Sequence, residues 1–145
     1  MPNRAEFKAL ALSRLKEARV LFNNGLYDGA FYLAGYSLES AFKARICKIL
    51  DSDYPQGRQE YGSFLTHNYV ILLKLAGLSR KLDIDKYANI TLANNWSLLT
   101  TVSSGWSETL RYKPIGNSNK TSVSDILDAL DDKNHGLISW LKKTW

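Results

Sequence analysis

Cysteine is almost missing from this chain: its 145 residues include a single one, Cys47. One cysteine cannot form a disulfide within the chain, and a zinc site of four thiolates is excluded as well. Histidine is scarce too, because two residues are too few for a histidine-rich metal site. We therefore expect no metal ion, and we expect Cys47 to be buried as a small apolar group.

Long hydrophobic runs are also missing. The uninterrupted apolar stretches are short, as at residues 30–36 and 70–73, and none approaches the roughly 20 residues that cross a bilayer. The first eight residues lack the apolar stretch of a signal peptide. These features predict a soluble cytoplasmic protein with no membrane partner.

Common catalytic and cofactor motifs do not occur either. The phosphate-binding patterns G-x-x-x-x-G-K-S/T and G-x-G-x-x-G are missing, and so is the zinc-protease motif H-E-x-x-H. The nucleophile elbow G-x-S-x-G is missing as well. We expect no cofactor.

The composition is that of one globular domain, 1–145, with 45% hydrophobic and 23% charged residues. The net charge is +5, and the excess lies at the two ends of the chain. Residues 1–50 hold 8 basic and 4 acidic side chains, residues 51–110 hold 5 and 6, and residues 111–145 hold 6 and 4. Such a charge permits binding to RNA or DNA, but solvated helix faces produce it too.

Apolar residues at helical spacing predict a first helix over residues 4–24, with Gly25 as its stop. Arg14 falls inside its apolar stripe, so the guanidinium must pair with a carboxylate or reach a dimer seam or a site. A second helix is predicted from Asp28, as its cap, to Leu50. Small residues on it allow neighbouring helices to approach closely.

The second helix is apolar nearly all round, which predicts burial. We expect its Glu39 to be buried and paired with Arg14 or Lys43, because an unpaired carboxylate there is costly. Its apolar surface is more than one small bundle covers, which predicts a homodimer.

Helical patterns continue to the end of the chain, and strict alternation of apolar and polar residues is missing. The expected fold is all-α, an antiparallel up-and-down bundle of four main helices plus a short one. We expect a loop at 51–65, a short helix at 67–76 capped by Thr66, a helix from Asp83 or Asp85 to Leu110, a loop at 111–121, and a last helix from Thr121 or Ser122 nearly to Trp145. In this last helix Asn134 falls in the apolar stripe, whereas His135 and Trp140 fall outside it.

Two residues form a candidate catalytic pair. His67 begins the short helix, where the positive helix end lowers the pKa of an imidazole and favours a neutral base. Arg111 ends the next helix, and up-and-down order brings these two ends together. The alternative is local: His67 makes a hydrogen bond nearby, and Arg111 stabilises the end of its own helix.

Short motifs occur in an order that is typical of one family. The segment RLKEARVLFNNGLYDGAFYLAGYSLESAFKARICKIL contains G-x-Y-x-x-A and E-x-x-x-K-A. The residues concerned are Gly25, Tyr27, Ala30, Glu39, Lys43 and Ala44. THNYVILL follows with a His–Asn step at His67, and WSETLRYKP contains Arg111 and Tyr112. The chain resembles HEPN-domain proteins over nearly its whole length.

The resemblance implies a helical bundle that commonly dimerises, in a bacterial or archaeal setting. Such proteins often accompany a minimal nucleotidyltransferase as a toxin–antitoxin pair, or belong to defence systems. Many are metal-independent endoribonucleases, whose signature is an arginine, four to six residues, and a histidine. Here eight residues separate Arg58 from His67, and 23 separate Arg111 from His135, so the signature is missing.

Three functions follow from these observations. The leading one is a dimeric module that binds a partner protein or RNA, with Tyr112, Arg14, Glu39 and Lys43 as candidate binding residues. The exposed Trp140 and Trp145 are typical of interface anchors. The second is a divergent metal-independent endoribonuclease that uses His67 and Arg111. The third is a purely structural oligomerisation module.

Overall fold

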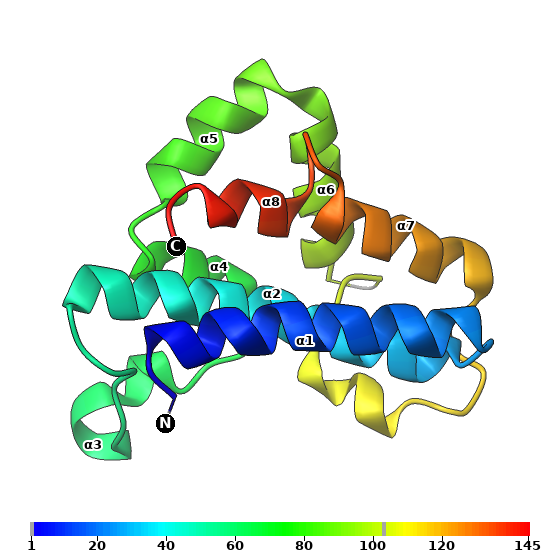
Figure 1. Cartoon of the computed structure of the whole chain (residues 1–145), viewed down its shortest axis with the longest axis horizontal. Helices are drawn as coiled ribbons and strands as arrows, with labels where there is room; N and C mark the ends of the chain where they lie inside the picture. The colour runs from blue at the N-terminus through cyan, green and yellow to red at the C-terminus, as the bar shows by residue number, and fades with distance from the viewer. Residues whose placement is uncertain (1, 103) are drawn as a thin grey trace.

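The computed structural model describes residues 2–102 and 104–145, and it is all-helical over that range, as predicted. Figure 1 shows the arrangement of the elements. They are α1 (Arg4–Asn23), α2 (Tyr27–Leu50), α3 (Arg58–Tyr61), the 3-10 helix η1 (Gly62–Phe64), α4 (Tyr69–Leu75), α5 (Ser79–Ala88), α6 (Ile90–Thr100), the 3-10 helix η2 (Glu108–Tyr112), α7 (Lys120–Asp131) and α8 (Leu137–Lys142).

The long helices α1 and α2 lie antiparallel and side by side (Figure 1). α1 begins with a capping box, in which the Asn3 side chain accepts from the Glu6 N–H and the Glu6 carboxylate accepts from the Asn3 N–H. α1 ends before Gly25, whose φ of 75° suits glycine. The first predicted helix is therefore confirmed to within a residue at its end.

Helix α2 forms the centre of the molecule. It packs against α1, α4, α7 and α8, and most of its residues are buried. Cys47 is 2% exposed, as predicted. Because its neighbours cover α2, the reason for expecting a dimer through this helix is wrong, while dimerisation itself stays a prediction.

Asp28 does not cap α2. The helix begins after Leu26 without a side-chain cap, and Asp28 lies in its first turn. The carboxylate accepts from the N–H groups of Gly116 and Ser118, at 2.7 and 2.8 Å, and these bonds hold its pKa below the usual value. Asp28 thus ties the loop before α7 to the start of α2.

The single helix predicted from residue 83 to residue 110 is wrong, because the end of α5, the whole of α6, a loop and the start of η2 occupy this range. α5 ends at Ala88, and Asn89 is extended while its side chain accepts from the Leu92 N–H to begin α6. α6 ends at Thr100, and η2 covers Glu108–Tyr112. An internal asparagine cap is thus the reason for the break.

The last helix is broken in the same way. The Asp132 carboxylate accepts from the N–H groups of Asn134 and His135, which competes with helix continuation and separates α7 from α8. Asn134 is consequently exposed rather than part of a stripe. His135 is half-buried rather than solvated, with its Nδ1 2.9 Å from the Asn89 amide nitrogen.

Three smaller predictions also need correction. The 51–65 segment contains α3 and η1 in place of a plain loop. α4 begins at Tyr69 and is capped by Asn68, while the Thr66 hydroxyl accepts from the Asn68 N–H. Trp140 is buried, and its indole donates to the Asp85 carboxylate at 2.7 Å.

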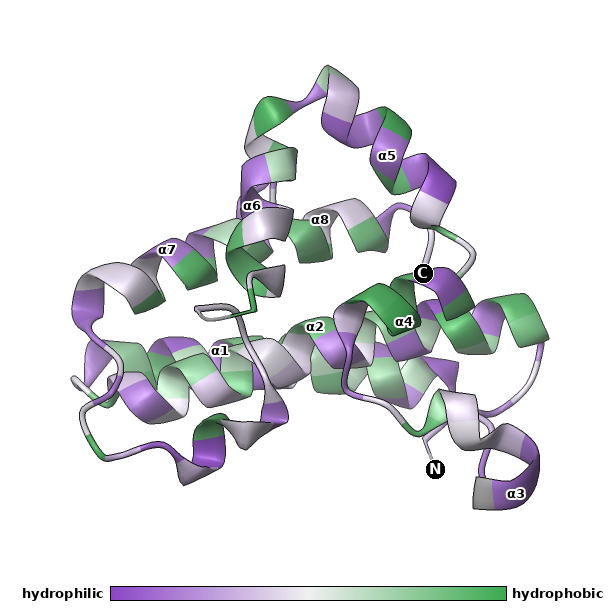
Figure 2. Ribbon diagram, turned by 180° about the vertical axis from the view of Figure 1, so that it is seen from behind, coloured by the Kyte–Doolittle hydropathy of each residue, from purple (hydrophilic) through white to green (hydrophobic). Residues whose placement is uncertain are grey.

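The α5–α6 arm extends from the rest of the bundle (Figure 1), and Figure 2 shows α5 as largely hydrophilic and α4 as largely hydrophobic. Leu82 is the buried residue of α5. No helix within residues 2–102 and 104–145 combines the length and apolar character that crossing a bilayer requires.

Candidate functional site

One buried carboxylate on α2, that of Glu39, contacts the side chains of Lys43 and His67. Glu39 is 4% exposed, and its Oε1 accepts from the Lys43 ammonium at 2.7 Å. Its Oε2 lies 2.8 Å from Nδ1 of His67, which comes from the segment just before α4. The prediction that Glu39 is buried and paired is confirmed for Lys43, and the fold adds His67 as a second partner.

Arg14 is not the partner of Glu39. Its Nη1 donates to both carboxylate oxygens of Glu17, one turn further along α1, at 2.8 and 3.0 Å. This local pair satisfies the guanidinium at the half-buried edge of α1. Arg14 therefore lies outside the Glu39 cluster.

Aromatic rings surround the Glu39 cluster. Tyr36 packs its ring edge against His67, with centroids 5.9 Å apart, and against Trp106 at 5.0 Å. The Lys43 ammonium lies 5.1 Å from the ring centroid of Tyr54. These contacts pack the Tyr36 ring against the imidazole, and they give Lys43 a favourable cation–π contact.

Trp106 is the largest of these rings, and its position depends on a glycine. It stacks on Tyr69 at 5.4 Å and donates from its indole N–H to the Tyr32 carbonyl at 3.1 Å. A Cβ atom at Gly35 would overlap the indole ring. The Tyr69 hydroxyl donates to the carbonyl of the same glycine at 2.8 Å. Gly35 thus permits the loop after α6 to pack on α2.

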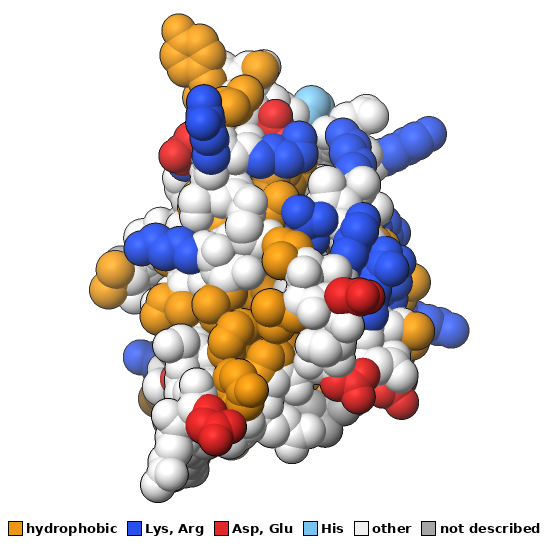
Figure 3. All heavy atoms as spheres, turned by 90° about the vertical axis from the view of Figure 1, so that its left-hand side faces the viewer, with side chains coloured by type: hydrophobic (Ala, Val, Ile, Leu, Met, Phe, Trp, Pro, Cys, Tyr) orange, Lys and Arg blue, Asp and Glu red, His pale blue; other side chains and the backbone are white. Residues whose placement is uncertain are grey.

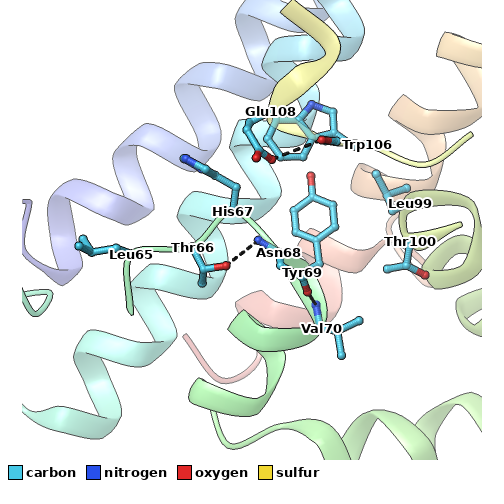
Figure 4. Close-up of a pocket in the computed structure, with 11 residues that line it drawn as sticks. Leu65, Thr66, His67, Asn68, Tyr69, Val70, Leu99, Thr100, Trp106 and Glu108 are labelled. Carbon is cyan, nitrogen blue, oxygen red and sulfur yellow. Dashed lines mark hydrogen bonds between the residues drawn. The ribbon is translucent and has the colours of Figure 1, made fainter. Parts of the chain in front are cut away.

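His67 borders a cavity of about 400 Å³ between α4, the end of α6 and the loop that leads to η2. Figure 4 shows Trp106 and Glu108 beyond the tip of Tyr69, with His67 on one side and Leu99 and Thr100 on the other. The remaining lining is largely polar: Leu65, Thr66, Asn68, Val70 and Ser107. The cavity therefore offers hydroxyl, amide, carboxylate and imidazole groups beside an aromatic wall.

The imidazole is both oriented and accessible. Nδ1 is held by Glu39, and Nε2 has no hydrogen bond to any residue that the structure describes. The His67 side chain is 43% exposed. A ring fixed through one nitrogen presents the other to a ligand as a donor or an acceptor.

The tyrosines near this cavity are not bases. Burial is the main reason that the pKa values of Tyr36, Tyr54 and Tyr69 are all raised, and the nearby Glu39 carboxylate raises them further. Their phenols stay protonated at neutral pH, so they can donate hydrogen bonds but cannot accept a proton.

Arg111 lies at a second, neighbouring cavity of about 240 Å³. Arg111 lines it together with Tyr32, Asp28 and Lys113. The guanidinium lies 4.8 Å from the ring centroid of Tyr112, and the Tyr32 side chain is the first cause of its raised pKa. This cavity carries two cations and one carboxylate.

Two tyrosines connect the cavities. The hydroxyls of Tyr32 and Tyr36 are 3.4 Å apart, with Tyr36 against His67 and Tyr32 beside Arg111. No direct hydrogen bond joins His67 to Arg111 within the described residues. The catalytic pairing of His67 with Arg111 thus stays a prediction.

Sequence reasoning missed the aromatic part of this site. Tyr36, Tyr69 and Trp106 were not among the candidate site residues, and only the fold places Tyr36 against His67 and the other two in the cavity that His67 borders. A weak signal was present, because Tyr36 precedes Glu39 by three residues and therefore shares its helix face. Within the same described residues, no group of three or more His, Cys, Asp or Glu side chains could hold a metal ion.

Comparison of the chain with protein-family models, with curated proteins and with solved structures finds no match. The proposed function therefore depends on the geometry of the two neighbouring cavities.

Proposed function

We propose that the chain is an HEPN-like module that binds RNA across its two neighbouring cavities. The observation that carries the proposal is their difference in charge. The His67 cavity contains the Glu108 carboxylate and neutral polar groups, whereas the neighbouring cavity contains the two cations Arg111 and Lys113 and one carboxylate, Asp28. The charge of a ribonucleotide is distributed in a matching way, because its neutral hydroxyls and base edges lie next to an anionic phosphate.

In this arrangement the ribose and base occupy the His67 cavity, where the free ring nitrogen of His67 contacts a hydroxyl or a base edge. The phosphate lies toward Arg111, whose guanidinium suits phosphate oxygens. The exposed Tyr112 ring offers a surface on which a following base stacks.

The test is fluorescence anisotropy with a labelled single-stranded RNA, in EDTA. We expect His67→Ala to weaken binding about tenfold, the loss of about one good contact. His135→Ala is the matched control, because it removes the other histidine of the chain, which contacts Asn89. Equal affinity of the wild type and His67→Ala would contradict the use of this cavity, and no binding by the wild type would end the proposal.

A second function, metal-independent cleavage of RNA, is favoured by the contact between His67 and Glu39. A carboxylate that holds one imidazole nitrogen prepares the other to act as a base. Nε2 takes the proton of a ribose 2′-hydroxyl, the 2′-oxygen attacks phosphorus, and the bond to the 5′-oxygen breaks. The 5′-oxygen takes a proton from water, and the products are a 2′,3′-cyclic phosphate and a 5′-hydroxyl.

The same RNA samples, analysed on a denaturing gel, separate binding from cleavage. Cleavage in EDTA that is lost in His67→Ala and retained in His135→Ala supports the enzyme. Cleavage that survives both His67→Ala and Arg111→Ala places any nuclease site elsewhere. Intact RNA with retained binding supports a module that binds without cutting.

We also infer that the module acts as a homodimer within a toxin–antitoxin or defence system, with a nucleotidyltransferase as the partner. Exposed apolar residues supply a candidate surface at the corner of the arm, where Ile84, Tyr87 and Ile90 are 60%, 97% and 73% exposed. Co-purification with the product of the neighbouring gene tests the partner.

A further inference from the structure

Four cations of residues 1–50 lie on one face of the molecule, where they meet Thr144 and Trp145. Arg4 and Lys8 lie at the start of α1, and Arg45 and Lys48 lie near the end of α2. Figure 3 shows Lys and Arg side chains gathered on the face where these helix ends meet. We refer to these four residues as the basic face.

Main-chain oxygens hold the basic face together. Arg4 Nη2 donates to the main-chain oxygen of Trp145 at 2.6 Å, and Arg45 Nη1 and Lys48 Nζ both donate to the Thr144 carbonyl at 3.0 Å. The Lys8 ammonium lies 5.5 Å from the ring centroid of Trp145. Side chains from two distant parts of the sequence, in α1 and α2, therefore converge on Thr144 and Trp145.

Acidic side chains are missing around the cations of this face. Within residues 2–102 and 104–145, no Asp or Glu carboxylate lies within 4.0 Å of the four cations, whereas Arg14, Arg19, Lys43, Lys81 and Lys86 all have acidic partners. The pKa of Lys8 is lowered by burial and then by the charges of Arg4 and Lys48. The Glu6 carboxylate accepts from the Asn3 N–H at the start of α1. Main-chain oxygens, rather than acidic side chains, thus hold these mutually repelling cations.

We propose that the basic face binds the phosphate backbone of RNA, as a second contact surface apart from the His67 and Arg111 cavities. A guanidinium has five N–H donors and an ammonium has three, so donors remain after the carbonyl contacts. Phosphate oxygens accept stronger, charge-assisted hydrogen bonds and carry the negative charge that no acidic side chain supplies to these four cations. The Trp145 ring beside Lys8 adds an aromatic surface for a base. This inference rests on the proposed function.

The experiment measures the salt dependence of binding of labelled single-stranded RNA to the full chain. Each lysine that neutralises a phosphate contributes about 0.7 to the slope of log K against log salt for a single strand. The double variant Lys8→Gln and Lys48→Gln should lower the magnitude of the slope by about 1.4. Its affinity near physiological salt should fall roughly tenfold, and equally for all RNA sequences. Single-stranded DNA should lose affinity in parallel, since its backbone carries the same phosphates.

The matched control is the double variant Lys120→Gln and Lys133→Gln, which makes the same change in net charge at the start of α7 and after its end. We expect it to keep the wild-type slope, and circular dichroism checks that both variants are folded. An unchanged slope in the basic-face variant, or the same loss in both variants, would overturn the inference.

The outcomes also separate this inference from the proposed function. RNA binding that His67→Ala weakens and the basic-face variant leaves unchanged retains the function and removes the basic face from it. No RNA binding by the wild type ends both. Binding of the wild type to phosphatidylglycerol vesicles in place of RNA, lost in the basic-face variant, would assign the face to a membrane surface and overturn the inference.

Discussion

At the scale of single residues, Glu39 contributes both to the stability of the fold and to the candidate site. Glu39→Ala leaves the Lys43 ammonium, itself 9% exposed, without its carboxylate partner. We expect the free energy of unfolding to fall by about 3 kcal/mol, the usual cost of breaking a buried ion pair. Urea denaturation followed by circular dichroism measures this change.

Glu17→Ala is the control, because Glu17 forms an ion pair with Arg14 near the surface of α1. Exposed pairs contribute about 1 kcal/mol or less, so this variant should retain most of the stability. Equal losses in Glu17→Ala and Glu39→Ala would show that Glu39 behaves as a surface residue.

Single residues also show which contacts the sequence could reveal. Glu39 and Lys43 are four residues apart on one helix, so their pairing could be read from spacing. His67 reaches Glu39 across 28 residues, and no local pattern indicates that contact. Arg14 does pair with a carboxylate, which was one of its predicted alternatives, but the partner is Glu17, one turn away on its own helix, and not Glu39.

At the scale of elements, the close packing of the loop after α6 against α2 depends on Gly35. Gly35→Ala places a methyl group into the indole of Trp106, whose ring stacks on Tyr69 and cannot withdraw freely. We expect a loss of about 1–3 kcal/mol in the free energy of unfolding, as for other overpacked positions. Trp fluorescence should change as the indole shifts.

Gly29→Ala in the same helix is the comparison. A Cβ atom there would meet the Leu21 side-chain end at 3.2 Å, and that methyl can move aside. Alanine also favours the helix by up to about 1 kcal/mol. Stability should therefore stay level or rise. A loss at position 29 that matches the loss at position 35 would contradict the role given to Trp106.

Helix ends could be predicted where a glycine marks them and not where a polar side chain interrupts a continuous pattern. Gly25 and Gly77 both have positive φ and follow helix ends close to the predicted ones. Asn89 and Asp132 instead break apolar stripes that continue across them. Their side chains bond to main-chain N–H groups, a choice that depends on packing of the arm and of α8.

For the whole molecule, we expect a homodimer that forms through the corner of the α5–α6 arm. Light scattering at micromolar concentration should give about twice 16.4 kDa. Tyr87→Glu adds a charge to the most exposed aromatic ring of this corner and should shift the mass toward 16.4 kDa.

Tyr61→Glu is the control for that experiment, since it adds the same charge to an exposed tyrosine of α3. A wild-type mass of 16.4 kDa, or a dimer that Tyr87→Glu leaves intact, would contradict this interface.

The helical class of the molecule followed from periodicity alone, but its arrangement did not. Apolar spacing predicts which faces are buried without saying what buries them. The surface of α2 was thus assigned to a second copy, whereas α4, α7 and α8 of the same chain cover it. The meeting of basic residues of α1 and α2 with Thr144 and Trp145 likewise depends on long-range packing.

The burial of Cys47 makes site-specific labelling straightforward. The thiol is enclosed and its pKa is raised, first by burial, so maleimide reagents have little thiolate to attack. The natural chain therefore behaves toward them as if it had no cysteine. A cysteine introduced at Tyr87, and another at Lys120, would each accept a probe without removing Cys47. Paired spin labels or fluorophores could then report how far the arm moves when RNA is added.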